Sequence, residues 1–192
     1  MLEISKIVEV AEAVVSDTAN FKEIKPEGSI TPDLAKKYIE QLFDEKDNIE
    51  KTIEKELNEY FDDLKNKSEC PDTIADKPFD SSELKTLTPE ENAKMREEFD
   101  DKKNQLKHEW EIVNGRSWPK YECDVYSANG KLIRKAGSDY DAHHIHPLSL
   151  GGKNEVSNIT PLNAEVHYDK QGIHSPDSPY NKICQILGEM NI

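Results

Sequence analysis

Five of the six histidines in this 192-residue chain fall within 32 residues, at positions 143, 144, 146, 167 and 174. Imidazole binds divalent transition metals, and it also gains or loses a proton near neutral pH. Hydrolysis of a phosphodiester needs both properties, because a cation must stabilise charge on the phosphate while a base activates water. The cluster therefore indicates a metal-dependent hydrolytic site.

The residues around the first of these histidines predict a strand that ends in a loop. His143 and His144 are adjacent, so on a strand their side chains point to opposite faces. One can bind a metal while the other meets water only if the strand is distorted or ends there. Pro147 and the Gly151-Gly152 pair indicate such an exit into a loop, the glycines supplying backbone freedom.

A second strand and a helix are expected after that loop. Asn158 begins a short strand, and Asn163 is a suitable cap for a helix that carries His167. The resulting strand–loop–strand–helix unit would hold a metal between the end of a strand and a helix.

A β-hairpin is predicted before this unit. Residues 121–127 alternate enough to form one strand, residues 128–130 (Ala-Asn-Gly) form the turn, and residues 131–135 return as the partner. The Asn-Gly dipeptide favours positive φ at both of its positions. Lys131, Arg134 and Lys135 would either contact phosphate or form a solvated face.

Four motifs follow one another in this half of the chain. They are Trp-Pro-Lys-Tyr at 118–121, Ala-His-His-Ile-His-Pro at 142–147, Gly-Gly-Lys-Asn-Glu at 151–155, and Gly-Ile-His at 172–174. Together they resemble the HNH nucleases of the His-Me finger (ββα-metal) superfamily, which includes the colicin-type DNases. The C-terminal nuclease domains of bacterial polymorphic toxins are closer still. The resemblance covers residues 105–185 and none of the first 100.

The resemblance implies a role for two residues in catalysis. His144 would be the general base that deprotonates the attacking water. Asn158 would brace the loop and orient that base without touching the substrate. His146 is expected to be an outer or loop residue, and His108 an exposed or packed residue on the preceding helix.

The resemblance also implies a metal centre with histidine ligands. His143 and His167 would be two of them, and His174 would be the third. In colicin-type enzymes the last histidine follows the previous one by four residues, where this chain has Gln171. One divalent ion is implied, and the sequence does not choose among Mg, Mn, Ni and Zn.

Charge divides the chain into two unlike parts. The net charge is −14, and residues 1–100 hold 14 Lys and Arg against 27 Asp and Glu, whereas residues 101–192 hold 11 against 12. All six histidines lie in the second part. We therefore divide the chain into an acidic helical region, 1–104, and a nuclease domain, 105–192.

Helical spacing of apolar residues predicts long helices in the acidic region. The predicted segments are helices over 2–15, 34–64 and 88–114, separated by loops over 21–30 and 68–86. Thr31-Pro32 is a typical helix start, and residues 34–64 would form one long helix or a pair. Thr88 and Glu91 have the spacing of a capping box, and Asn114-Gly115 is a typical helix end.

The expected fold class is α+β, with a mostly helical first half followed by a small β-hairpin and a ββα-metal finger. The acidic half would serve as a helical support or export domain, dock a partner, or shield a basic groove by mimicking nucleic acid. The mimic alternative requires that residues 101–192 alone bind DNA more tightly than the whole chain.

The function that this pattern favours is hydrolysis of DNA by an antibacterial toxin. RNA cleavage by the same fold is the second alternative, because no motif in the sequence indicates whether a 2′-hydroxyl is recognised. A non-catalytic, metal-stabilised nucleic-acid-binding module is the third, although such a module would have no use for His144 as a base. A toxin would also have an immunity protein as its partner.

Composition excludes some other classes. No apolar run approaches the roughly 20 residues that cross a bilayer. The N-terminus lacks the pattern of a Sec signal peptide, so we expect synthesis in a bacterial cytoplasm, export by a specialised route, and action in a target-cell cytoplasm. Three scattered cysteines, Cys70, Cys123 and Cys184, argue against a disulfide framework and against a cysteine-built zinc site.

Overall fold

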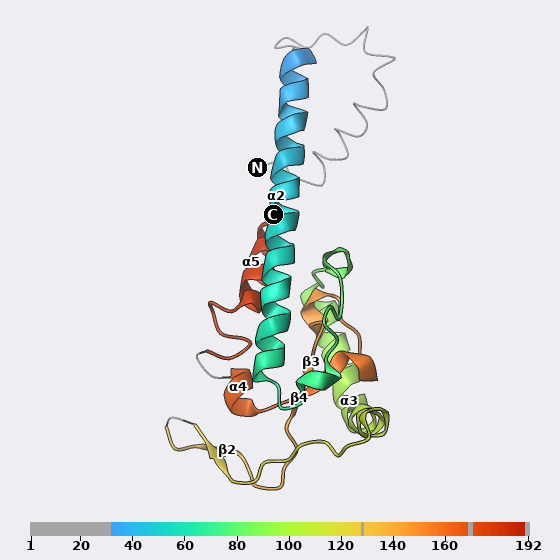
Figure 1. Cartoon of the computed structure of the whole chain (residues 1–192), viewed down its shortest axis with the longest axis vertical. Helices are drawn as coiled ribbons and strands as arrows, with labels where there is room; N and C mark the ends of the chain where they lie inside the picture. The colour runs from blue at the N-terminus through green and yellow to red at the C-terminus, as the bar shows by residue number, and fades with distance from the viewer. Residues whose placement is uncertain (1–31, 128, 169–170, 191–192) are drawn as a thin grey trace.

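A computed structural model describes residues 32–127, 129–168 and 171–190, and it has the predicted α+β class (Figure 1). Its helices are α2 (Pro32–Lys67), α3 (Pro89–Asn114), α4 (Ala164–Tyr168) and α5 (Pro179–Met190). Its strands form two separate antiparallel pairs, β1 (Val125–Tyr126) with β2 (Leu132–Arg134) and β3 (Asp141–His144) with β4 (Ile159–Leu162). The helix predicted over 2–15 and the loop over 21–30 lie outside the described residues.

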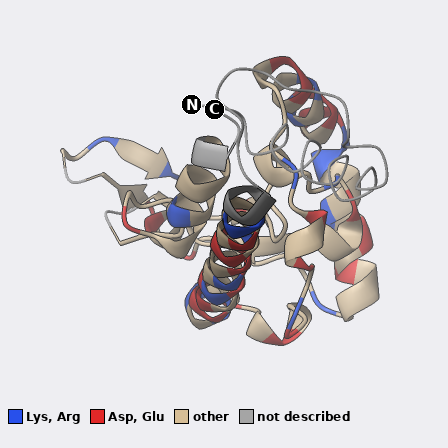
Figure 2. Cartoon of the chain, turned by 90° about the horizontal axis from the view of Figure 1, so that it is seen from above, with Lys and Arg blue, Asp and Glu red and all other residues tan. Residues whose placement is uncertain are grey.

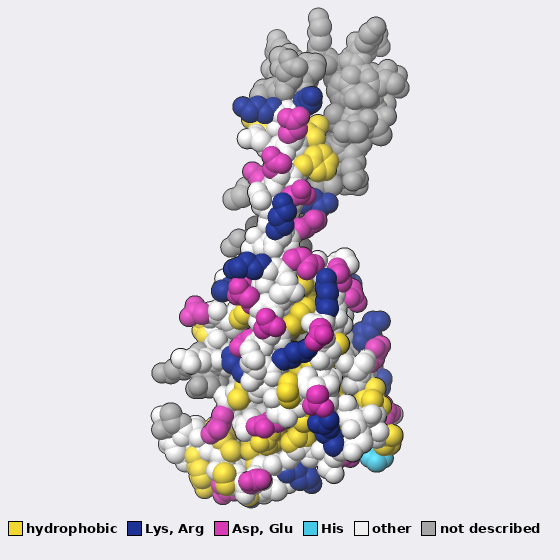
Figure 3. All heavy atoms as spheres, viewed as in Figure 1, with side chains coloured by type: hydrophobic (Ala, Val, Ile, Leu, Met, Phe, Trp, Pro, Cys, Tyr) yellow, Lys and Arg dark blue, Asp and Glu magenta, His cyan; other side chains and the backbone are white. Residues whose placement is uncertain are grey.

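Helix α2 is one continuous helix of 36 residues, beginning at Pro32 as predicted. Ion pairs one turn apart, such as Lys46 with Glu50 and Lys55 with Glu59, support its exposed side. The first part of the helix projects from the body of the molecule, and both signs of charge are intermixed on the face in Figure 3. Seen end-on in Figure 2, α2 again carries acidic and basic positions together.

The segment between α2 and α3 and the ends of α3 follow the sequence pattern closely. Two short 3₁₀ turns, η1 (Pro71–Thr73) and η2 (Ser81–Glu83), occupy the predicted loop. The Thr88 hydroxyl accepts from the Glu91 N–H, and the Glu91 carboxylate accepts from the Thr88 N–H, which is the predicted capping box. Gly115 ends α3 with φ 62°, in the left-handed region that glycine adopts most easily.

The predicted hairpin is present, but its strands are shorter and its turn differs. Only 125–126 and 132–134 pair as strands, with an irregular register between Val125 and Tyr126. The prediction of a positive φ at both Asn129 and Gly130 was wrong. Of these two residues only Gly130 has a positive φ, of 76°. The Gly130 N–H donates to the Ser127 carbonyl, and the Ser127 N–H donates to the Lys131 carbonyl. Five positions, 127–131, lie between the two strands, and Gly130 is the described residue among them that takes the left-handed conformation.

Strands β3 and β4, with the helix α4 that follows, form the unit that carries the histidines. His143 pairs with Thr160 and His144 with Ile159 in the antiparallel register. Asn163 then caps α4, because its side-chain oxygen accepts from the Glu165 N–H. The order of strand, loop, strand and helix is the predicted one.

One hydrophobic core joins α2 to this unit. Its buried residues include Ile53, Leu57, Tyr60, Phe61 and Leu64 from α2, Ile145 and Leu162 near β3 and in β4, and Ile173 and Ile183 further on. The buried carboxylate of Glu56 also pairs with Lys182 of α5 at 3.2 Å. The boundary predicted at 104/105 falls within α3, and burial of apolar side chains crosses it.

Two expectations from composition can be compared with the described residues. Across these residues, none of the helices is both long enough and apolar enough to span a membrane. The three cysteines are free thiols, with Cys70 buried and Cys123 exposed.

Candidate metal centre

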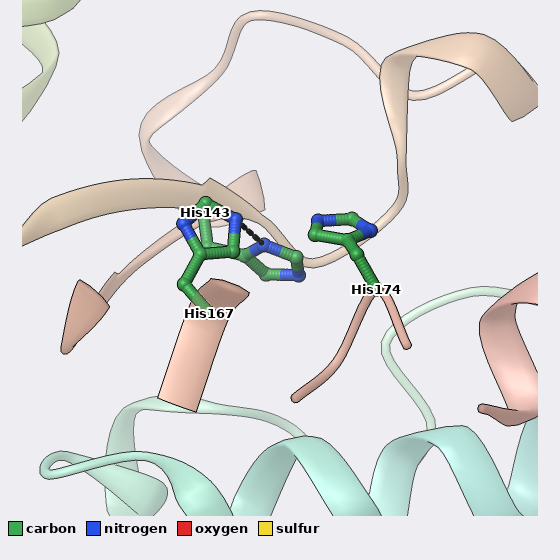
Figure 4. A group of neighbouring side chains, drawn as sticks. All are labelled: His143, His167 and His174. Atoms are coloured by element: carbon green, nitrogen blue, oxygen red, sulfur yellow. Dashed lines mark hydrogen bonds between the residues drawn. The ribbon is translucent and has the colours of Figure 1, made fainter. Parts of the chain in front are cut away.

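His143, His167 and His174 converge although they come from three different segments (Figure 4). His143 is on β3, His167 is on α4, and His174 lies in the turn region that precedes α5. One potential ligand atom of each lies within 4.8 Å of the others. His143 Nδ1 and His167 Nε2 are 3.2 Å apart, so these two ring nitrogens face one another. The structure thus brings together the three residues predicted as ligands.

The outer nitrogen of His143 is held by a tyrosine of α2. The Tyr60 hydroxyl lies 3.1 Å from His143 Nε2 and donates to the Ile145 carbonyl at 2.9 Å. Both rings are buried, with 1% of Tyr60 and 3% of His143 exposed. Burial raises the pKa of the Tyr60 hydroxyl, so that group keeps its proton.

The outer nitrogen of His167 faces a carboxylate. His167 Nδ1 lies 3.5 Å from Asp141 Oδ2, and Arg134 holds Asp141 through three hydrogen bonds of 2.8 to 3.0 Å. Burial favours a higher pKa for Asp141, but the hydrogen bonds from His167 and Arg134 outweigh it and lower that pKa. The sequence offered Arg134 as a possible phosphate contact. In the structure its guanidinium instead forms hydrogen bonds with Asp141.

His174 closes the group on its exposed side. Its ring centre is 5.3 Å from that of His143 and 5.0 Å from that of His167, and it packs edge-on against Tyr180 of α5 at 4.8 Å. Gln171 is the residue at the colicin-type spacing, and its main-chain carbonyl accepts a hydrogen bond from the Lys67 ammonium at 2.6 Å. The geometry groups His174 with the other two histidines.

The group has the chemistry of a divalent metal site. Burial lowers the pKa of His143 well below 6.5, and the neighbouring His167, His174 and His144 lower it further. Although His174 is the exposed member of the group, the loss of water around its ring and the charges of His167 and Arg96 lower its pKa to about 4. Imidazole nitrogens gathered this closely match the ligand preference of transition metals, so the three histidines could hold a divalent ion, and carboxylate contacts behind such ligands are common.

His144 lies beside this group in a different hydrogen-bond environment. Its Nε2 is 3.0 Å from Asn154 Oδ1, and the Asn154 amide donates to the Met95 carbonyl of α3 at 3.0 Å. The ring rests edge-on against Phe99, with centres 4.3 Å apart. Burial lowers the pKa of His144 to about 4, against the raising effect of Asn154, and the charge of Arg96 lowers it further. This imidazole is neutral near pH 7.

Asn158 ties together both ends of the loop after β3. Its oxygen accepts from the His146 N–H at 2.7 Å, and its amide donates to the carbonyls of His146 and Lys153. His146 itself stacks on Phe79 and bonds the Leu150 carbonyl, away from the three clustered histidines. The contact to the His144 ring comes from Asn154, a loop residue to which the sequence assigned no role.

Gly152 is required by the close approach of that loop to itself. A Cβ at this position would lie 1.8 Å from the His146 carbonyl oxygen. Its own N–H donates to the Pro147 carbonyl at 3.0 Å. Sequence reasoning assigned both loop glycines to backbone freedom, which fits Gly151 at φ 98°. At position 152 glycine is needed because the neighbouring carbonyl leaves no room for a Cβ atom.

A cleft of about 270 Å³ opens over the four histidines. His143, His144, His167 and His174 all contribute to its lining, with Arg96 of α3 at its edge. Arg96 is exposed, and its charge acts on the pKa values of both His144 and His174. The cleft therefore combines three possible metal ligands with an exposed cation, Arg96, and an exposed acid, Asp100.

Sequence reasoning missed four residues that support the site: Tyr60, Arg96, Asp141 and Asn154. Asp141 had a local signal, because it lies two positions before His143 and so shares its face of the strand. Asn154 also had a local signal, because it belongs to the Gly-Gly-Lys-Asn-Glu motif at 151–155. Tyr60 and Arg96 had no such signal, since they come from helices far along the chain.

Two curated proteins are similar to parts of this chain. Toxin YxiD of Bacillus subtilis (strain 168) is 41% identical over 104 residues, which is 54% of this chain. A protein named probable deoxyribonuclease RhsB, from Dickeya dadantii (strain 3937), is 34% identical over 71 residues, or 37% of this chain. The matched stretches make up 18% and 4% of those two proteins.

These relatives are therefore much longer than the part that this chain matches. No protein family model matches the chain, and no solved structure matches it.

Proposed function

We propose that this chain is a metal-dependent HNH endonuclease that hydrolyses phosphodiester bonds in DNA and acts as an antibacterial toxin. The observation that carries the proposal is the convergence of three imidazoles within 4.8 Å, in a cleft that His144 also lines. The unit of β3, β4 and α4 would be the ββα-metal finger. A metal without a neighbouring base would suit a structural site, and the presence of His144 beside the three histidines supports a catalytic one.

His144 is the proposed general base. The Asn154 amide donates to the Met95 carbonyl, so its oxygen faces His144 and must accept from Nε2–H. That arrangement leaves Nδ1 with a lone pair, able to take a proton from water. Asn158 is proposed to orient His144 indirectly, by holding the loop that carries Asn154.

His143, His167 and His174 are the proposed ligands of one divalent ion. When bound, such an ion stabilises negative charge on the phosphate and on the departing oxygen. Arg96, at the rim of the same cleft, would contact the phosphate backbone.

DNA is favoured as the substrate because one similar protein is named a probable deoxyribonuclease. The toxin role is favoured because the other is named a toxin. A toxin of this kind would need an immunity protein that covers the cleft or a surface beside it. It would be made in a bacterial cytoplasm, exported by a specialised route, and active in a target-cell cytoplasm.

The test is cleavage of supercoiled plasmid and, separately, of total RNA by the purified chain with Mg²⁺, Mn²⁺, Ni²⁺, Zn²⁺ or EDTA. We expect metal-dependent plasmid nicking that falls about 10²–10⁴-fold in His144→Ala, the usual contribution of a general base. His108→Ala is the matched control, because His108 is an exposed histidine on α3. It should cleave like the unchanged chain.

The other outcomes separate the alternatives. Cleavage of RNA alone would make the chain a ribonuclease of the same fold. Failure to cut either polymer, with metal binding demonstrated by calorimetry, would support a metal-stabilised binding module and end the nuclease proposal.

A further inference from the structure

Helix α2 lies outside the stretch whose motifs resemble nucleases, yet it contributes a side chain to the metal centre. The Tyr60 hydroxyl contacts His143 Nε2 at 3.1 Å and the Ile145 carbonyl at 2.9 Å. We propose that Tyr60 is a positioning residue that keeps the proton of His143 on Nε2 and thereby presents Nδ1 to the metal. The inference rests on the metal centre of the proposed function.

Counting protons gives the direction of each bond. A tyrosine hydroxyl has one proton, and here it is donated to the Ile145 carbonyl. The contact with His143 Nε2 must then be a bond in which the imidazole N–H donates to the tyrosine oxygen. His143 Nδ1 is left with its lone pair, and that atom is the one that faces His167 Nε2 at 3.2 Å.

His167 is oriented in the complementary way. Its Nδ1 faces Asp141, which as a carboxylate can only accept, so its proton belongs on Nδ1 and its lone pair on Nε2. Two lone pairs 3.2 Å apart repel one another unless a cation lies between them. The outer contacts from Tyr60 and Asp141 therefore prepare the same gap for a metal from opposite sides.

Removing the hydroxyl would change which nitrogen carries the proton. Without Tyr60 the Nε2–H of a ring that is only 3% exposed would lose its acceptor, which buried donors avoid. The ring would instead carry its proton on Nδ1 and donate to His167 Nε2. That bond would occupy both inner nitrogens, so metal binding would have to break it.

The experiment compares Tyr60→Phe with Ile53→Val in the full chain. Both residues are buried on α2 in the same core, but only Tyr60 contacts His143. Zn²⁺ affinity is measured by competition calorimetry without nucleic acid, and Co²⁺ absorption reports ligand geometry. We expect Tyr60→Phe to weaken Zn²⁺ binding about 10-fold or more and to alter the Co²⁺ spectrum, as outer contacts of metal ligands commonly do. Ile53→Val should leave both unchanged.

The unchanged protein provides a second measurement that needs no variant. Long-range proton–nitrogen correlation of the Zn²⁺-loaded chain identifies which ring nitrogen of His143 carries the proton. We expect the proton on Nε2 and the metal on Nδ1. The reverse pattern would overturn the inference even if Tyr60→Phe failed to fold.

The outcomes separate this inference from the proposed function. Equal Zn²⁺ affinity in Tyr60→Phe and the unchanged chain would overturn the role of Tyr60 and leave the nuclease proposal standing. If the unchanged chain bound neither Zn²⁺ nor Co²⁺, the metal centre and this inference would both fall. Plasmid cleavage is measured separately and does not enter either decision.

Discussion

At the scale of single residues, the cleft is built from histidines held by different partners. Tyr60 and Asp141 hold the outer nitrogens of His143 and His167, whereas Asn154 holds that of His144. The partner of each ring sets which nitrogen can bind a metal and which can accept a proton. In the proposed mechanism the same residue type would therefore serve both as metal ligand and as base within one cleft.

Arg96 is the residue whose replacement should affect nucleic-acid binding directly. It is an exposed cation at the rim of the cleft. We expect Arg96→Ala to weaken binding of a DNA duplex and to reduce the slope of log affinity against log salt by about 1, because one phosphate contact is lost. The measurement is fluorescence anisotropy in EDTA across a salt series. The control is Lys102→Ala, since Lys102 pairs with Glu98 on the same helix. An unchanged slope in Arg96→Ala would count against a phosphate contact.

The buried histidines predict how stability depends on pH in the metal-free protein. Burial lowers the pKa of His144 to about 4 and that of His146 below 6.5, whereas both are ordinary in the unfolded chain. Between pH 6.5 and 4 the unfolded state binds more protons, so the free energy of unfolding falls as pH falls. His144 is only partly buried, which limits its contribution to on the order of 1 kcal/mol.

Urea denaturation in EDTA at pH 7, 5.5 and 4.5 measures this dependence. His144→Gln should show a shallower loss between pH 7 and 4.5, because one of the groups has been removed. A free energy of unfolding that rises on acidification across this window would contradict the assignment.

At the scale of elements, the loop between β3 and β4 approaches itself most closely at Gly152. We expect Gly152→Ala to lower the free energy of unfolding by about 3 kcal/mol, because its Cβ would meet the His146 carbonyl oxygen at 1.8 Å. The control is Gly188→Ala in α5, where an added Cβ has no atom within 4 Å. That change should stabilise by about 0.5–1 kcal/mol, as alanine favours helix. Thermal unfolding measures both, and equal effects of the two changes would refute the steric argument.

Elements with strong local signals were predicted well from the sequence. The capping box of Thr88 and Glu91 and the glycine end of α3 depend on contacts within a few residues. The pattern over 34–64 left one helix or two, and the structure has one. The β-hairpin was located correctly, but its strand lengths and turn geometry were not. Those features depend on irregular pairing, such as the shift between Val125 and Tyr126.

At the scale of the whole molecule, the three clustered histidines and α2 belong to one packed body. The core shared by α2, β4 and α5 places Tyr60 against His143. We expect metal to raise the unfolding temperature of the entire described fold. At 100 times the dissociation constant the gain is about 2.7 kcal/mol, or about 5–10 °C for a chain of this size.

Two probes measured side by side test this prediction. Far-ultraviolet circular dichroism follows mainly α2 and α3, and tryptophan fluorescence follows Trp110 and Trp118. With Zn²⁺ the two melting curves should coincide and should shift upward together relative to EDTA. A second transition in circular dichroism that metal does not move would mean that α2 unfolds independently of the three clustered histidines.

The sequence by itself determined the kinds of residue available and the order of local elements. Histidine spacing, the Asn163 cap and the loop glycines predicted a strand–loop–strand–helix unit, because such signals act over a few residues. Only the tertiary structure decided that Tyr60 contacts His143, 83 positions away in the sequence, and that Arg134 donates its hydrogen bonds to Asp141. Those contacts are decided by how α2 and the hairpin pack. Burial of side chains selects that packing, and no spacing along the chain encodes it.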